Sequence, residues 1–314
     1  MSYAQFGTIQ ASDYNGLIGS GTTANALNTV WSTGTSTYGY GQTALTSVSV
    51  GATVLASEWA NLVNRTANSA AHQSSSITSV AAPVAGGTIT YNANVVTNLQ
   101  TIYTNRLNAV SQSGTTSNTA TYGSTWLNAI TFTHTVSFAN GDAARYFFNS
   151  GGQLAVTCAH PSGTGINLLL NNLASNVGTV VLSSPTSGSA TIAGTSYNGI
   201  TRIGGGGNAP TIATNSGYYA LTTSNANVYY QTASTGPSGY LSTNINIFIK
   251  TNGTQGSNGD TGSVITISTV WDEIPNGLTV STGSETTVTL RPPEVTNIAN
   301  TWGTPTVTGT VTGS

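Results

Sequence analysis

Asp142 and Arg145 are the residues whose types and spacing most resemble a chemically active pair, because they lie three positions apart in ANGDAARYFFNSGGQL, residues 139–154. A carboxylate that works as a general acid or base needs a partner acid or base close to it, and the neighbouring sequence offers neither. A short helix explains the same residues, since Asn140 or Asp142 would cap its start and Asp142 would pair with Arg145 one turn later. We therefore predict a structural corner here and not an active site.

The remainder of this stretch fits the same interpretation. Tyr146, Phe147 and Phe148 would pack the helix onto a sheet. Gly151 and Gly152 would end it with a left-handed residue. The predicted corner consists of Asp142, Arg145, Tyr146, Phe147, Gly151 and Gly152.

The histidines and the single cysteine are isolated in the sequence. His72, His134 and His160 have no carboxylate at metal-ligand spacing. H-E-x-x-H, C-x-x-C, G-x-S-x-G and Walker motifs are absent. Cys158 lies in LAVTCAH, which predicts a strand, where a cysteine is usually a small buried hydrophobic residue. We therefore predict no catalytic residue, no metal and no cofactor.

A polysaccharide-degrading enzyme is the enzymatic alternative, because such an enzyme needs two close carboxyl groups in a groove. Asp272, Glu273 and Glu285 are the weak candidates for that pair. Successive residues of a strand point to opposite faces, so Asp272 and Glu273 are poorly placed to act together.

The chain is nearly uncharged. Charged residues make up 4% of its 314 residues, and six Lys and Arg against eight Asp and Glu give a formal net charge of −2. So few basic residues argue against binding to nucleic-acid phosphates or to an anionic membrane surface. Thr, Ser, Asn and Gly take the place of the charges, and near-neutral proteins tend to self-associate. We therefore expect a homo-oligomer.

Hydrophobic periodicity predicts helices in the first part of the chain. The segments 54–73 and 92–110 both place apolar residues on one face at helical spacing. Thr53 or Ser57 could cap the first of them. Residues 111–122 form a linker by composition, and residues 166–177 predict another packed helix.

Strands dominate the rest of the sequence. Residues 129–138 alternate apolar and polar side chains with the period of a half-buried strand, and residues 153–160 alternate again. Pro275 and Gly277 predict a turn. Further strands are predicted at 179–183, 218–222, 227–232, 244–250, 263–271, 277–281 and 286–292.

The predicted fold class is mainly β with a few helices (α+β). Residues 1–120 would form an irregular and helical N-terminal docking module, and residues 121–210 an α+β module with a strand-helix-strand core. Residues 211–296 would form a β-sandwich-like domain. Residues 297–314 would be an extended tail, lying along a neighbour or disordered.

Five tyrosines crowd one part of the predicted β-domain: Tyr218, Tyr219, Tyr229, Tyr230 and Tyr240. Exposed tyrosines anchor interfaces and present rings on which a ligand can stack, so they could form a surface for a glycan or a protein partner. Alternate tyrosines could instead line the core.

Three stretches resemble a family of virion structural proteins of tailed bacteriophages, which occurs in phages of aquatic bacteria, including cyanobacteria. They are YGYGQ at 38–42, the helix ASEWANLVNRTANSAAHQ at 56–73, and the strand that runs into DAARYFFNSGGQL at 142–154. The resemblance covers roughly residues 38–160 and rests on descriptive motifs, none of them catalytic.

The resemblance implies a non-enzymatic fibre or collar/neck-type appendage that assembles in the host cytoplasm with other virion proteins. It favours a trimer as the homo-oligomer. A baseplate or capsid-decoration protein is one alternative. A glycan-binding surface adhesin is another, but it predicts an export signal, which the opening MSYAQFGTIQ does not resemble.

Overall fold

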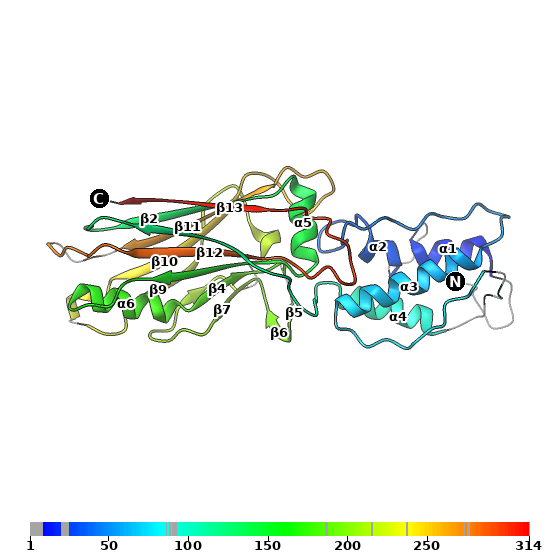
Figure 1. The fold of residues 1–314 in the computed structure, drawn as a ribbon, viewed down its shortest axis with the longest axis horizontal. Coiled ribbons are helices and arrows are strands. Elements are labelled where there is room, and N and C mark those ends of the chain that lie inside the picture. Colours follow the sequence, from blue (N-terminus) through cyan, green and yellow to red (C-terminus); the bar gives the residue numbers. More distant parts are fainter. Residues whose placement is uncertain are drawn as a thin grey trace.

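The computed structural model describes residues 9–19, 25–85, 87, 89, 93–185, 188–214, 216–236, 238–272, 274 and 277–313. Helices occupy one end of an elongated molecule, and the sheets run lengthwise through the other part (Figure 1). The predicted fold class, mainly β with a few helices, is confirmed.

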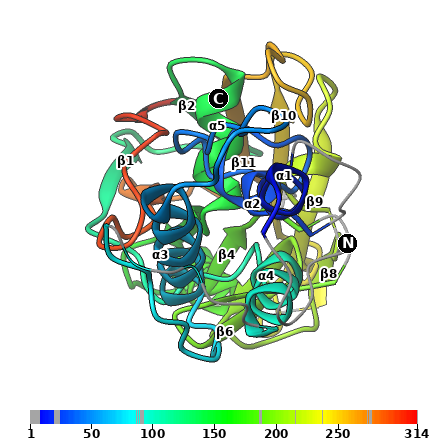
Figure 2. The same cartoon turned by 90° about the vertical axis from the view of Figure 1, so that its right-hand side faces the viewer.

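The helical end is built from the predicted helices and two shorter ones, which face the viewer in Figure 2. The first predicted helix begins after Leu55 and not at Thr53 or Ser57, because the Glu58 carboxylate accepts the Leu55 N–H at 2.7 Å and so caps the start. The helices are α1 (Ala11–Ile18), α2 (Leu27–Trp31), α3 (Ala56–His72) and α4 (Asn94–Thr104).

The other part of the chain is a β-sandwich with a helix, α5 (Gly141–Asn149), at the end next to the helical part (Figure 1). A second helix, α6 (Ile166–Val177), packs beside the strands. The strands are β1 (Thr116–Tyr122), β2 (Ile130–Ser137), β3 (Gln153–Ala159), β4 (Thr179–Leu182), β5 (Ala190–Ile192), β6 (Thr195–Tyr197), β7 (Ile200–Ile203), β8 (Thr211–Ile212), β9 (Ala226–Thr232), β10 (Asn244–Thr251), β11 (Val264–Asp272), β12 (Ser284–Arg291) and β13 (Thr306–Gly313).

The two main sheets mix strands from both predicted modules. One sheet has five strands in the order β1-β12-β3-β4-β7, and the other has six in the order β13-β2-β11-β10-β9-β8. Each sheet therefore contains strands from both sides of the predicted boundary near residue 210, so this boundary does not separate two domains. Residues 116–313 contribute to one sandwich. The sequence pattern could not show this, because the pairing partners of a strand are not written in its own alternation.

The prediction that residues 297–314 form an extended tail is also wrong for their described part. That part contains β13, which pairs antiparallel with β2 over eight residues, from Thr306 opposite Ser137 to Gly313 opposite Ile130. Without β13, β2 would be an edge strand with unpaired backbone groups. The segment therefore belongs to this chain's own sheet.

Two predicted strands are not strands. Residues 218–222 contain instead a short 3-10 helix, Tyr218–Ala220, because Tyr218 turns inward and stacks on Phe148 with ring centroids 4.3 Å apart. Residues 277–281 make only an isolated bridge, between Val280 and Trp126. Pro275, the first residue of the predicted turn, lies outside the described residues.

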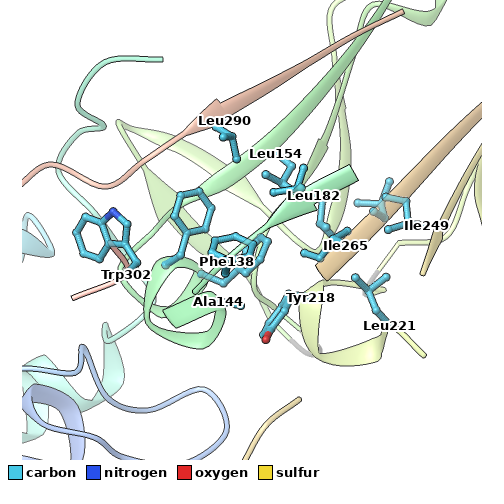
Figure 3. Close-up of a cluster of buried hydrophobic side chains, with 14 of the residues drawn as sticks. Phe138, Ala144, Leu154, Leu182, Tyr218, Leu221, Ile249, Ile265, Leu290 and Trp302 are labelled. Atoms are coloured by element: carbon cyan, nitrogen blue, oxygen red, sulfur yellow. The ribbon is translucent and has the colours of Figure 1, made fainter. Parts of the chain in front are cut away.

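Aromatic rings fill the sandwich core where α5 enters it. Phe138, Phe147 and Phe148 form mutually tilted or edge-on pairs with centroids 5.2–6.2 Å apart. The view in Figure 3 places Phe138 and Tyr218 beside aliphatic side chains of both sheets, such as Leu290 and Ile265. Phe147 and Phe148 thus hold the helix against the sheets, as expected.

A smaller core covers part of the outer face of the five-stranded sheet. The hairpin of β5 and β6 contributes Ala190 and Ile192, which pack with Ala155 and Val181 of the sheet. The β5–β6 hairpin therefore covers part of the outer face of the five-stranded sheet, whereas it does not cover the outer face of the six-stranded sheet.

Candidate functional site

The predicted corner forms. Arg145 and Asp142 make an ion pair at 3.0 Å, and the Asn140 side chain caps α5 by accepting the Ala143 N–H at 2.8 Å. Gly151 has φ of +92°, a left-handed conformation that ends the helix. Phe147 is buried. The ion pair, the helix cap and the left-handed terminal glycine are therefore the contacts that the sequence predicted.

Contrary to the prediction, Tyr146 does not pack onto the sheet. Its ring lies against Gly41 of the helical part, so closely that a Cβ at Gly41 would collide with it. Tyr146 therefore faces the junction between the two parts of the molecule. Gly41 also has φ of +71°, so its position favours glycine twice over.

Arg145 is the central residue of that junction. Its side chain is only 1% exposed. The guanidinium donates to the carbonyl oxygen of Thr33 at 2.7 Å and to that of Tyr38 at 3.0 Å, and it lies 4.8 Å from the Tyr146 ring centroid. An arginine of the sandwich thus binds the backbone of the 33–39 loop, which follows α2.

Two further side chains bind the same loop. Asn149 Nδ2 donates to the carbonyl oxygens of Ser36 and Tyr38, at 3.1 and 3.0 Å. The Tyr219 hydroxyl lies 2.6 Å from the Ser36 carbonyl and 2.7 Å from Asn149 Oδ1. Sequence reasoning missed Asn149, because its partners lie more than 100 positions earlier in the chain.

The three histidines lie apart. His134 is buried on β2. His72 Nε2 lies 3.0 Å from the Ser150 carbonyl oxygen, and its Nδ1 lies 3.6 Å from Glu294 Oε1. Burial lowers the pKa of His72, His134 and His160. No three His, Cys, Asp or Glu side chains gather as a metal site within the described residues.

Two of the three candidate carboxylates, Asp272 and Glu285, lie within the described residues. Glu285 on β12 accepts a hydrogen bond from Thr121 at 2.9 Å, in the five-stranded sheet. Asp272 ends β11, in the six-stranded sheet. Glu273 lies outside the described residues. The two described acids therefore belong to different sheets.

Cys158 is half-buried on β3 beside Thr286. Desolvation raises the pKa of its thiol to about 12. Since the thiolate is the reactive form, the structure agrees with a packed, unreactive cysteine.

The five tyrosines do not form one surface. Tyr218 and Tyr229 are fully buried and contribute to the core, so neither can stack on a glycan. Tyr219 binds the 33–39 loop through its hydroxyl. Tyr230 and Tyr240 are partly exposed. Tyr229 and Tyr230 differ in burial because successive residues of a strand point to opposite faces of the sheet.

The outer face of the six-stranded sheet carries a regular array of hydroxyl groups. Thr308 of β13 lies beside Thr135 of β2, and Thr135 lies beside Thr266 of β11. The residues between them are turned inward, with Val136 and Ile265 buried. We call the outward Thr, Ser and Val side chains of these three strands the hydroxyl face: Thr306, Thr308, Thr310, Thr312, Thr131, Thr133, Thr135, Ser137, Val264, Thr266, Ser268 and Val270. Asp272, the last residue of β11, also points outward and lies at the border of this face.

None of the twelve residues of the hydroxyl face is charged, and ten of them are Thr or Ser. Each hydroxyl can donate and accept a hydrogen bond. The alternating Thr was visible in the sequence, but the register that aligns three distant strands was not. This face is the most extensive candidate functional surface among the described residues.

The end of the helical part away from the sandwich is apolar in places. Val50 and Leu55 are 97% and 56% exposed. They line a cleft of about 790 Å³ between the starts of α1 and α3. Val84 is also largely exposed.

Comparisons with known proteins give no relative: no family model, no curated protein and no solved structure matches this chain. None of the described helices is long and apolar enough to span a bilayer.

Proposed function

We propose that this chain is a non-enzymatic structural component of a tailed-phage virion, a fibre or collar/neck-type appendage that assembles as a homo-oligomer. The hydroxyl face carries the proposal. A broad uncharged surface can be buried in a permanent contact without the cost of desolvating charges.

The two-part architecture supports the same role. Arg145, Asn149 and Tyr219 hold the 33–39 loop against the sandwich, so force on one part passes to the other through a hydrogen-bonded junction. The helical end would dock to the virion. Its exposed Val50 and Leu55 suit a protein contact, because exposed apolar groups gain free energy when a partner covers them.

The first test is the mass of the purified chain in solution, by light scattering after size exclusion. A stable multiple of the chain mass supports the proposal, and the multiple distinguishes the trimer favoured by the resemblance from other orders. A monomer at high micromolar concentration would remove the homo-oligomer from the proposal.

The second test concerns the particle. Antibodies to the purified chain should label virions of the phage that encodes it, at one place in electron micrographs. Labelling of the neck or fibres supports an appendage, whereas labelling of the baseplate or capsid supports the alternative locations. Absence of the chain from purified virions by mass spectrometry would refute a virion role.

A further inference from the structure

We propose that two copies of the chain associate through their hydroxyl faces, related by a two-fold axis that runs across the strands. The inference rests on the proposed function and deepens it, because it assigns the self-association to one surface and one symmetry. The occupant of the hydroxyl face is therefore a second copy of this chain.

The chemistry of the hydroxyl face is complementary to itself. Thr and Ser hydroxyls donate and accept alike, so the face needs no different surface to satisfy its hydrogen bonds. Its twelve positions carry no charge, and the charged residues Lys250 and Asp272 lie at its border. A symmetric contact in which each copy offers the same patch is the commonest arrangement of homodimers.

The size of the proposed contact suits a specific interface. The contact extends from the hydroxyl face, on β13, β2 and β11, over the outward sides of the neighbouring strands β10 and β9, since three strands of eight residues alone would cover only about 390 Å². Strands are about 4.8 Å apart and rise about 3.4 Å per residue, so five strands of eight residues cover about 650 Å² on each copy. Both copies together bury about 1,300 Å², within the range of about 1,200–2,000 Å² for specific interfaces.

The charges that border the face fit the two-fold arrangement. Lys250 on β10 lies opposite Thr266, near one end of the neighbouring strand, and Asp272 forms the other end of that strand. A two-fold axis across the strands exchanges the two ends, so it brings Lys250 of one copy toward Asp272 of the other. Two such contacts of opposite charge would fix the register of the faces.

The five-stranded sheet is a poorer candidate for this contact. The β5–β6 hairpin packs over Ala155 and Val181 on its outer face, which interrupts the flat surface. Glu285 of β12 also lies on that face, and a two-fold contact would bring two such carboxylates into one interface.

The test places a charge at the centre of the proposed five-strand contact. Ser268 is the middle outward residue of β11, the middle of the five strands. Ser268→Lys and Ser268→Glu each put like charges near one another across the axis, so each should raise the dimer dissociation constant at least about 100-fold. An equimolar mixture of the two variants should restore a dimer, which also shows that both variants are folded.

Thr157→Lys is the matched control, since Thr157 points outward from β3 on the other sheet. Light scattering should show a dimer for the wild type, for this control and for the mixture. An oligomer that survives Ser268→Lys unchanged, a loss of assembly in Thr157→Lys as large as in the Ser268 variants, or a wild-type trimer would overturn the two-fold contact but leave the homo-oligomer standing. A wild-type monomer would overturn both.

Discussion

Arg145→Ala should destabilise the folded chain by about 3–5 kcal/mol, the usual cost of removing one partner from a buried ionic group. The side chain is 1% exposed and makes hydrogen bonds of 2.7 Å to Thr33, 3.0 Å to Tyr38 and 3.0 Å to Asp142. Each hydrogen bond to a charged group contributes about 1.5–3 kcal/mol. The sum overestimates the loss, because the Asp142 carboxylate is 23% exposed and can be hydrated when Arg145 is gone.

Equilibrium unfolding in urea measures this change. Tryptophan fluorescence is a suitable signal, because Trp31 ends α2 just before the 33–39 loop and Trp271 lies in the sandwich. Amide hydrogen exchange adds a local reading: the Tyr40 N–H, which donates to Val30 at 2.9 Å, should lose protection in Arg145→Ala before the sandwich strands do.

Two further variants show whether the loss of stability comes from the hydrogen bonds of Arg145. Arg145→Met retains most of the side-chain packing but leaves the Thr33 carbonyl without the donor that Arg145 supplies, whereas the Tyr38 carbonyl keeps its hydrogen bond from Asn149. The variant should therefore still cost about 1–3 kcal/mol for the unsatisfied Thr33 carbonyl. Arg291→Ala, at a half-buried position on β12, should change stability by less than about 0.5 kcal/mol. A loss below about 1 kcal/mol in Arg145→Ala would refute the importance of the junction.

Three further predictions concern glycine, cysteine and histidine. Gly39 and Gly51 both have positive φ, +92° and +84°, so alanine at Gly51 should cost about 1–2 kcal/mol, whereas at Gly39 it should lower the melting temperature further because its Cβ would meet the Thr33 carbonyl. Cys158, whose pKa is raised to about 12, should react with Ellman's reagent at pH 8 at least about 100-fold more slowly in the native chain than in urea. Burial lowers the pKa of His134, so the unfolded chain binds more protons and stability should fall as the pH drops below about 6.5. His134→Leu should flatten that fall in urea titrations at pH 7.5 and 5.5, and an unchanged slope would show that His134 does not contribute.

The sequence predicted those elements whose signal is local. β2 and β10 follow the two-residue alternation of their side chains, and α3 follows its apolar stripe. The corner at Asp142 and Arg145 was also predictable, because its cap, ion pair and terminal glycine lie within the twelve residues 140–151.

The contacts that join distant segments were not predictable in this way. Arg145 satisfies an arginine's need for acceptors with backbone carbonyls of residues 33 and 38, and any loop could have supplied them. β13 has the alternation of a strand, but its Thr and Gly content is equally typical of an unpaired tail. Only its pairing with β2 distinguishes the two.

The hydroxyl face shows why the outward residues of such strands carry information about association. Exposed sheets commonly carry lysine or other charged residues, which discourage non-specific contact between copies. Thr131, Thr133 and Thr135 point outward, so charged residues there would cost the core nothing. Asp272 is the one charged residue among the thirteen outward residues of β13, β2 and β11, which leaves a free copy with little of that protection. A defined contact with a second copy removes the exposed surface, which is the physical reason why an assembly accounts for this face better than a solitary chain does.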